Sequence, residues 1–205
     1  MYKKPLIVFE GIEGSGKTLH SKFLANYFKK RKLKFIRLRE PGGNINSEKI
    51  RKLILSNKSK FHKITDLLLY LAARNENLEN LIKKNYKKRI IIIDRFIDST
   101  LAYQHYGMGI NYNLINYLNK YLTNKIKIDL TFVNLVNSKN LKIRLSKRKN
   151  LNRYDKFNIK FYTNVQNGYL KIYKKNKSRY KIINSNKTIS ENRKIIIQKV
   201  TNLLK

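Results

Sequence analysis

Short runs of apolar residues recur along the chain, separated by longer segments in which apolar residues return every three or four positions. The short runs are apolar without alternation, which is typical of strands buried on both faces of a sheet. The expected strands are Leu6–Phe9, Phe35–Leu38, Ile90–Ile93, Leu130–Val136 and Tyr180–Ile183. Because strand-length and helix-length patterns alternate, the sequence predicts an α/β fold with a central five-stranded parallel sheet flanked by helices.

Helical patterns fill the segments between these strands. They are Lys17–Arg31, Ser47–Leu55, Ile64–Asn85, Ser99–Tyr106, Tyr112–Tyr121, Leu141–Arg148, Ile159–Lys175 and Ile189–Leu204. The last begins with Thr188-Ile189-Ser190-Glu191, a capping-box pattern that satisfies free N–H groups at the start of a helix. The chain has no internal repeat and no linker rich in Pro, Gly or Ser, so we expect residues 1–205 to form one domain.

A glycine-rich segment joins the first expected strand to the first expected helix. Gly11, Ile12, Glu13, Gly14, Ser15, Gly16, Lys17 and Thr18 match the phosphate-binding P-loop pattern G-x-x-x-x-G-K-[ST]. The glycines let the backbone curl so that its N–H groups face a phosphate, and the following helix adds its positive end. Lys17 would reach the outer phosphates, and the Thr18 hydroxyl would hold Mg²⁺. The alternative is a glycine-rich turn with a chance Lys-Thr pair, but the flanking strand and helix argue against it.

Composition narrows the class of protein. Without cysteine, the chain has no disulfide framework, thiolate zinc site or cysteine nucleophile, and its three histidines lie far apart in sequence. It carries neither a signal peptide nor a membrane-spanning run, so we expect a cytoplasmic protein with no membrane partner. The formal net charge of +35 would attract nucleic acids. Lysine is spread over every segment, as when an AT-rich genome biases codon use, and we therefore expect no specific nucleic-acid partner.

Charged residues follow two more of the expected strands. Asp94 and Arg95 come directly after Ile90–Ile93, and Arg39 follows Leu38. In open α/β sheets, ligands bind beyond the carboxyl ends of the strands. There Asp94 can orient Mg²⁺ and Arg95 can neutralise a transferring phosphoryl group, unless the two form only an exposed ion pair. Arg39 can grip a phosphate with two N–H groups, and Arg51 follows in the next helix.

Two pairs of residues at helical spacing are suited to binding a planar base. Tyr70 and Arg74 are four positions apart and share a helix face, where an aromatic ring and a guanidinium could stack on a base and hydrogen-bond to it. Thr100 and Gln104 are also four apart and offer a hydroxyl and a carboxamide to one side, with the ring of Tyr103 beside them. An aromatic residue on such a helix is more often part of the core, so each pair alone is a modest signal.

Together, the order and spacing of these motifs resemble the thymidylate kinase family, which phosphorylates dTMP. The likeness covers essentially the whole chain, and its most specific segments are Phe9–Thr18, Arg39–Gly43, Leu69–Arg74 and Asp94–Gln104. It implies a P-loop NTPase fold of the nucleoside monophosphate kinase type with a short lid. It also implies transfer of the ATP γ-phosphoryl group to dTMP with Mg²⁺, giving dTDP and ADP for dTTP synthesis, and a homodimer.

The resemblance assigns roles to particular side chains. It implies that Glu13 lies near the dTMP sugar and phosphate, and that Arg39, Arg51 and Arg95 position the monophosphate. It implies that Tyr70 stacks on thymine and that Tyr103 closes the sugar pocket. Residues that bind the polar edge of thymine are Arg74, Thr100 and Gln104. In this comparison Lys17 and Thr18 hold the ATP phosphates and the metal, which Asp94 orients.

The family divides by the source of a catalytic arginine, and this chain resembles the class that supplies it from a mobile lid. The other class carries that arginine in the P-loop, where this chain has Gly14. The lid is expected at about residues 147–156, a polar segment dense in Lys, Arg and Asn. Arg153 fits the catalytic position best, and Arg148 is second. The alternative for this segment is a solvated basic loop.

Two other functions remain open at this point. One is a kinase of the same fold acting on dUMP, dCMP, AMP or a deoxynucleoside, against which the set Tyr70, Arg74, Thr100 and Gln104 argues. The other is a nucleic-acid-binding protein that retains a P-loop, which would need neither Asp94-Arg95 nor a base pocket. Where the family usually has Phe, Tyr70 adds a hydroxyl to the stacking ring.

Overall fold

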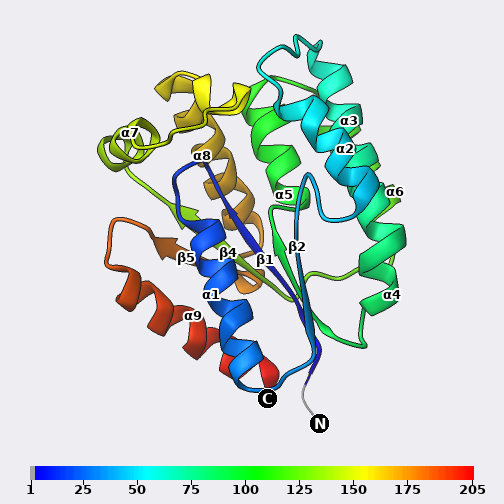
Figure 1. The fold of residues 1–205 in the computed structure, drawn as a ribbon, viewed down its shortest axis with the longest axis vertical. Coiled ribbons are helices and arrows are strands. Elements are labelled where there is room, and N and C mark those ends of the chain that lie inside the picture. The colour runs from blue at the N-terminus through cyan, green and yellow to red at the C-terminus, as the bar shows by residue number, and fades with distance from the viewer. Residues whose placement is uncertain (1–2) are drawn as a thin grey trace.

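The five apolar runs form one parallel sheet in the computed structural model, which describes residues 3–205 (Figure 1). The strands are β1 (Leu6–Gly11), β2 (Phe35–Arg39), β3 (Ile90–Asp94), β4 (Leu130–Leu135) and β5 (Tyr180–Asn184). All five predicted strands are therefore confirmed, with differences of one or two residues at their carboxyl ends.

Strand order places the predicted chemistry at one edge of the sheet. The order is β2-β3-β1-β4-β5, so β1 lies centrally between β3 and β4. Phe9 of β1 is in register with Asp94 of β3, and Asp94 is in register with Arg39 of β2. Because these strands are parallel, the P-loop after β1, the end of β3 and the end of β2 meet at the same edge.

Helices cover both faces of the sheet. They are α1 (Lys17–Lys30), α2 (Ile45–Leu55), α3 (Lys63–Asn77), α4 (Lys83–Asn85), α5 (Ile97–Thr100), α6 (Tyr112–Leu122), α7 (Ser138–Ser146), α8 (Ile159–Lys175) and α9 (Ile189–Leu204). One core layer joins Leu24 of α1 and Ile196 of α9 to Ile7 and Ile92. On the other face, Val8 and Ile93 pack with the segment that follows α3. The alternation of faces along β1 and β3 explains why these strands are apolar throughout.

Two predicted helices are interrupted by π-helical segments, which corrects the sequence prediction. The expected helix Ile64–Asn85 divides into α3, a π segment over Leu78–Ile82, and α4. The expected helix Ser99–Tyr106 begins two residues earlier as α5 and continues as a π segment over Leu101–Gly107. A π turn differs from an α-helical turn in that each N–H bonds the carbonyl five residues earlier instead of four. The spacing of apolar residues does not reveal this difference. Such segments occur frequently at functional sites, and the second carries Tyr103 and Gln104.

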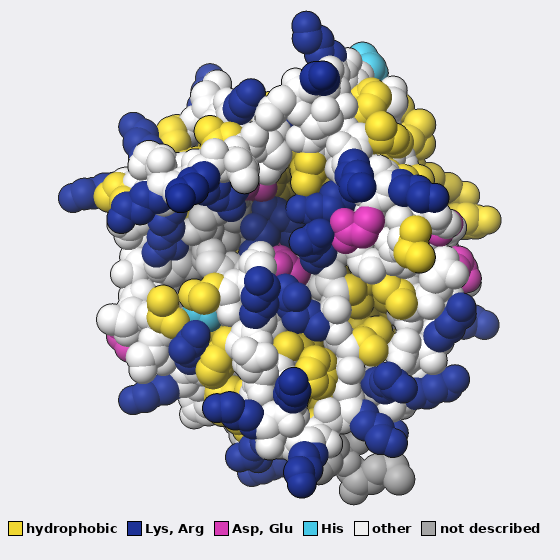
Figure 2. All heavy atoms as spheres, viewed as in Figure 1, with side chains coloured by type: hydrophobic (Ala, Val, Ile, Leu, Met, Phe, Trp, Pro, Cys, Tyr) yellow, Lys and Arg dark blue, Asp and Glu magenta, His cyan; other side chains and the backbone are white. Residues whose placement is uncertain are grey.

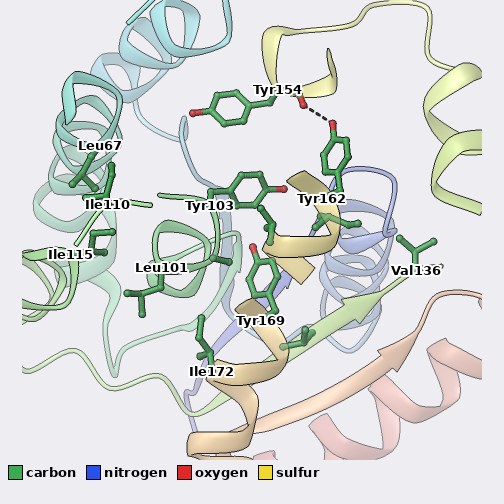
Figure 3. Packing of buried hydrophobic residues seen from close by; sticks show 14 of the residues in the cluster. Leu67, Leu101, Tyr103, Ile110, Ile115, Val136, Tyr154, Tyr162, Tyr169 and Ile172 are labelled. Atoms are coloured by element: carbon green, nitrogen blue, oxygen red, sulfur yellow. Dashed lines mark hydrogen bonds between the residues drawn. The ribbon is translucent and has the colours of Figure 1, made fainter. Parts of the chain in front are cut away.

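Helix α8 packs closely against this second π segment. A Cβ at Gly168 would lie 2.5 Å from the ring of Tyr106, a distance that a side chain cannot adopt without displacing its neighbour. Glycine therefore permits the close approach of α8. The approach brings Tyr162 and Tyr169 of α8 beside Tyr103 of the π segment (Figure 3).

Other local predictions are also met. The capping box at the start of α9 forms, with Thr188 and Glu191 bonding each other's backbone N–H groups. The polar segment expected to be loop-like contains one 3₁₀ turn, Arg153–Lys156, capped by the Asn152 and Asp155 side chains. Among the described helices, none has the length and apolar character needed to cross a lipid bilayer.

Candidate active site

A cleft lies at the carboxyl edge of β1, β2 and β3, and Lys and Arg side chains gather around it (Figure 2). Its walls come from the P-loop, the ends of β2 and β3, helices α2 and α3, the second π segment and the lid region. All nine residues that the resemblance assigns to the dTMP site line it: Glu13, Arg39, Arg51, Tyr70, Arg74, Arg95, Thr100, Tyr103 and Gln104. Lys17, Thr18 and Asp94 line it too.

The P-loop has the backbone conformation that its glycines allow. Gly11, Gly14 and Gly16 have φ of +144°, +68° and +86°, which L side chains rarely adopt. A Cβ at Gly11 would also lie 2.6 Å from the Asn134 carbonyl of β4. Gly16 begins α1 in a left-handed conformation, and no side chain caps the start of that helix. The positive end of α1 is thus left to a phosphate-bearing ligand.

The Lys17 side chain folds over the P-loop. Its ammonium donates to the Ile12 carbonyl at 3.2 Å. Burial and the nearby Arg95 guanidinium lower the pKa of Lys17 to about 8, although Glu13 and Asp94 oppose this shift. A ligand phosphate would restore the lost stabilisation of the charged ammonium.

Arg144 of α7 braces the P-loop from outside the cleft. Its guanidinium donates to the carbonyl of Gly14 at 2.8 Å and to the carbonyl of Ser185, after β5, at 2.6 Å. The Ser185 hydroxyl in turn donates to the carbonyl of Ser15 at 2.6 Å. The loop is therefore tied to both α7 and β5, and no motif in the sequence indicated these contacts.

Thr18 and Asp94 meet where the resemblance places a metal ion. The Thr18 hydroxyl donates to the Asp94 carboxylate at 2.5 Å, and Arg37 of β2 lies 3.7 Å from the same carboxylate. Among residues 3–205 there is no cluster of three or more His, Cys, Asp or Glu side chains that could hold a metal by itself. A hydroxyl and a carboxylate fit Mg²⁺, because this ion is usually held by one or two protein oxygens, waters and substrate phosphates.

Arg95 reaches into the cleft because of an unusual backbone conformation. Its φ is +70°, a left-handed value that costs a residue other than glycine about 1–3 kcal/mol. The guanidinium lies 2.6 Å from the Glu13 carboxylate and 3.1 Å from the Tyr103 hydroxyl. Burial raises the pKa of Glu13, but the Arg95 and Lys17 charges outweigh it, so the pKa falls below its usual value. Glu13 is therefore an anion that holds Arg95 in place.

Three tyrosine rings form one part of the cleft wall. The rings of Tyr70 and Tyr154 meet edge to face at 5.9 Å, and those of Tyr103 and Tyr154 at 6.1 Å. Tyr154 comes from the lid region, and its carbonyl accepts the Tyr162 hydroxyl (Figure 3). Its own hydroxyl donates to Asp66 of α3. Sequence reasoning missed Tyr154 as a cleft residue, since a tyrosine in a basic loop gives no periodic signal.

The polar residues beside these rings are buried, and one has a free donor. The Arg74 guanidinium is only 2% exposed and donates to Glu40, Asn119 and the Phe96 carbonyl. Thr100 and Gln104 are each 2% exposed, yet the Gln104 side-chain N–H₂ has no hydrogen-bond partner. A buried donor without a partner costs about 1–3 kcal/mol, so a ligand acceptor at this position would be favourable.

Arg39 and Arg51 occupy the rim of the cleft. Arg39 is about half exposed and donates to both carboxylate oxygens of Glu48 at 3.1 Å. Arg51 donates to the Pro41 carbonyl at 2.6 Å. With Arg95 these side chains give the cleft a high density of positive charge.

The structure does not bring Arg153 to the cleft. Its guanidinium donates to the Ile54 carbonyl at 2.7 Å and forms an ion pair with Asp66. Arg148, by contrast, lines the cleft and pairs with Asp155. The sequence places both arginines in one polar segment, and it could not show which of them faces the cleft.

Comparisons with known proteins agree on one family. The family model described as thymidylate kinase matches residues 9–196. A thymidylate kinase of Sulfurihydrogenibium sp. is 40% identical over 194 residues, covering 93% of this chain and 94% of that protein. A thymidylate kinase of Wolbachia pipientis is 38% identical over 200 residues, covering 95% of this chain and 99% of that protein.

A solved structure gives the same result in three dimensions. The crystal structure of a thymidylate kinase from Ehrlichia chaffeensis superposes with a TM-score of 0.79 and is 33% identical in sequence. The match covers 97% of this chain and 98% of that one.

Proposed function

Because this chain belongs to the thymidylate kinase family, which transfers a phosphoryl group from ATP to dTMP, we propose that its cleft carries out this reaction. The products are dTDP and ADP, and the activity supplies dTTP synthesis. One observation is the main support for this proposal. The nine side chains expected around dTMP are spread between positions 13 and 104, yet they line a single cleft together with the P-loop.

We propose that thymine binds between the tyrosine wall and the buried polar residues. Tyr70 offers a ring face for stacking, and the unpaired Gln104 donor would bond an oxygen of the base. Arg74 is fixed by three protein acceptors and still has N–H groups for a thymine oxygen, while Thr100 adds a hydroxyl. Tyr103, whose hydroxyl is held by Glu13, would close the space around the deoxyribose.

We propose that the dTMP phosphate lies among Arg39, Arg51 and Arg95. The acceptor oxygen is already anionic, so no strong general base is needed. Catalysis then depends on positioning two anions in line and neutralising the charge between them. Arg95 is best placed for this role, because Glu13 and Tyr103 already fix its guanidinium in the cleft wall.

On the donor side, we propose that the P-loop holds ATP. Backbone N–H groups from Gly11 to Thr18 and the start of α1 would bind its phosphates, and Lys17 would leave the Ile12 carbonyl to contact the outermost ones. When bound, Mg²⁺ would offset charge on the ATP phosphates, and Thr18 and Asp94 would hold it. Arg37 lies 3.7 Å from the Asp94 carboxylate and would help to hold it in this position.

We propose that an arginine of the lid completes the positive charge when both nucleotides are bound. Arg153 is the residue that the resemblance favours, and it would have to leave Asp66 and the Ile54 carbonyl to reach the cleft. Arg148 is the alternative, supported by its position in the cleft wall. Closure of such a lid also excludes water, which would otherwise accept the phosphoryl group.

We also propose that the protein is a homodimer formed through α2, α3 and α6. Large apolar side chains on these helices are exposed to solvent: Ile45, Leu53, Leu68, Leu114, Tyr117 and Tyr121. Exposed apolar surface of this extent favours association with a second copy. A cytoplasmic location stays a prediction from the sequence.

The experiment that tests the function is ADP release across nucleoside monophosphates. We expect dTMP to be the best acceptor among dTMP, dUMP, dCMP and AMP, with turnover lost when Mg²⁺ is chelated. Faster turnover with another monophosphate would reassign the acceptor. Tight, salt-sensitive nucleic-acid binding with no dTMP-dependent ADP release would instead support a nucleic-acid-binding function.

A further inference from the structure

Next to Arg95 lies a buried carboxylate that the roles above leave unused. Glu10, in β1, is fully buried, and its two oxygens accept four hydrogen bonds. One oxygen accepts from the backbone N–H groups of Phe96 at 2.8 Å and Ser99 at 3.2 Å. The other accepts from the Ser99 hydroxyl at 2.5 Å and the Tyr169 hydroxyl at 3.1 Å. So many partners fix the carboxylate in one orientation.

The hydroxyls of Ser99 and Tyr169, which bind Glu10, also bind Arg95. They contact the guanidinium nitrogen that does not bond Glu13. One guanidinium nitrogen of Arg95 donates to Ser99 at 3.3 Å and to Tyr169 at 3.4 Å. A hydroxyl has a single proton to donate. The two hydroxyls also lie 2.8 Å from each other, so one of them can donate to the other instead of to Glu10. At least one hydroxyl proton goes to the Glu10 carboxylate, and both hydroxyls then present lone pairs to Arg95. Glu10 therefore sets the direction of the hydrogen bonds that hold this nitrogen.

Glu10 also supports the backbone on which Arg95 stands. Arg95 has a left-handed φ of +70°, and the next residue, Phe96, is bonded through its N–H to Glu10. Helix α5 begins after Phe96 without a cap from that residue's own side chain, and Glu10 bonds the N–H of Ser99 within it. One carboxylate thus anchors the turn after Arg95 and orients the partners of its side chain.

We propose that Glu10 is a positioning residue for phosphoryl transfer, which acts on Arg95 through Ser99, Tyr169 and the turn at Phe96. The proposal rests on the role given to Arg95 in the proposed function. An amide at position 10 would keep the shape but offer N–H groups to the two hydroxyls. At least one hydroxyl proton would then turn toward the Arg95 guanidinium, so that two hydrogen-bond donors would face each other.

The test compares two isosteric substitutions of buried carboxylates. Asp98 is 3% exposed and belongs to α5, but it bonds Arg179 and Tyr180. We expect Glu10→Gln to lower kcat by about 10- to 100-fold, because small displacements of a charged group have effects of this size. Asp98→Asn should lower the melting temperature but leave kcat within about threefold of wild type. Equal losses of kcat in both variants would indicate general loosening and overturn the proposal.

A double-mutant cycle shows whether Glu10 acts through Arg95. In an Arg95→Ala background, Glu10→Gln should cost little further activity, whereas multiplication of the two separate losses would overturn the proposal. If Glu10→Gln does not fold, Tyr169→Phe removes one hydroxyl alone and should lower kcat several-fold, and an unchanged kcat would again overturn it.

The same variants distinguish the positioning role of Glu10 from the catalytic role of Arg95 on which it depends. A slow Arg95→Ala enzyme with a normal Glu10→Gln enzyme would overturn only the positioning role. A near-normal Arg95→Ala enzyme would overturn the role of Arg95 in the proposed function, and the positioning role with it.

Discussion

The surroundings of Lys17 make its charged form less stable than that of an ordinary lysine. Burial and Arg95 lower its pKa to about 8, so the ammonium of the free enzyme loses its proton as the pH rises above that value. Phosphates of ATP are already ionised there. We therefore predict that the Kd for ATP rises with pH between 7 and 9.5, by up to about tenfold per unit above the pKa. Titration with a fluorescent ATP analogue at constant ionic strength measures this.

The matched control keeps the charge at every pH. Lys17→Arg, whose guanidinium remains protonated, should show a Kd that is nearly independent of pH over this range. A wild-type Kd that stays flat from pH 7 to 9.5 would contradict the assignment of Lys17 to the ATP phosphates.

Lys17 and Arg95 should both be needed for turnover. We predict that Lys17→Ala or Arg95→Ala lowers kcat by at least about 100-fold, because each removes charge aimed at the transferring group. Lys22→Ala is the control, since Lys22 is an exposed lysine of the same helix α1. Coupled ADP release and thermal melting measure the effect, and a near-normal rate in either variant would contradict the roles.

Single residues were predictable from sequence only where a motif fixes their place. The P-loop pattern identified Lys17 and Thr18, and the strand end identified Asp94 and Arg95. The sequence did not predict the supporting residues Arg37, Glu40 and Asn119. Arg37 contacts Asp94, and Glu40 and Asn119 accept hydrogen bonds from Arg74, all from distant parts of the chain. Such partners are determined by tertiary contacts, and no local spacing records them.

At the scale of elements, the lid region holds two competing arginines. Arg153 contacts Asp66 of α3, and Arg148 lines the cleft. We predict that Arg153→Ala lowers kcat by about 1,000-fold or more, as loss of a transition-state arginine does, with a smaller effect of Arg148→Ala. Single-turnover measurements report the chemical step directly.

A third variant separates the catalytic role from a structural one. Asp66→Asn weakens the contact that holds Arg153 but leaves the arginine present, so its kcat should stay within a few-fold of wild type. If Arg148→Ala alone lowers kcat, the catalytic arginine is Arg148 and Arg153 only anchors the lid.

Elements were predictable from the chain except where their hydrogen bonding changes. Apolar runs identified all five strands, most clearly β1 and β3, which are buried along their whole length. The edge strands β2 and β5 are only partly buried and include charged residues such as Arg37 and Lys181. The π segments Leu78–Ile82 and Leu101–Gly107 keep the apolar spacing of a helix, so the pattern predicted ordinary helices there. The second of them carries Tyr103 and Gln104 into the cleft wall, and the sequence did not predict its hydrogen bonding.

At the scale of the whole molecule, positive charge is scattered over the visible face rather than gathered into a stripe (Figure 2). This distribution fits the compositional origin expected from the sequence.

The order of the motifs along the chain gave no direct information on how they come together in the fold. That depends on the strand order β2-β3-β1-β4-β5, which brings Arg39, Asp94 and the P-loop together.

The exposed apolar face leads to a prediction about assembly. We predict that Leu68→Glu converts a homodimer to a monomer, since a carboxylate in an apolar interface would be desolvated without a partner. Light scattering after gel filtration measures the mass. Ile189→Glu is the control, because Ile189 is an exposed apolar residue on α9, at a distance from α2, α3 and α6 (Figure 1). An unchanged mass, whether that of a monomer or a dimer, would contradict this interface.

The Arg144 brace has a consequence for how this enzyme could evolve. A Cβ at Gly14 would lie 3.4 Å from the Arg144 side chain, and the φ of +68° there already disfavours any side chain. An arginine at position 14 would bring a second positive charge against the first. We therefore expect an arginine at position 14 to be tolerated better when Arg144 is replaced as well, so the two positions should tend to change together among descendants.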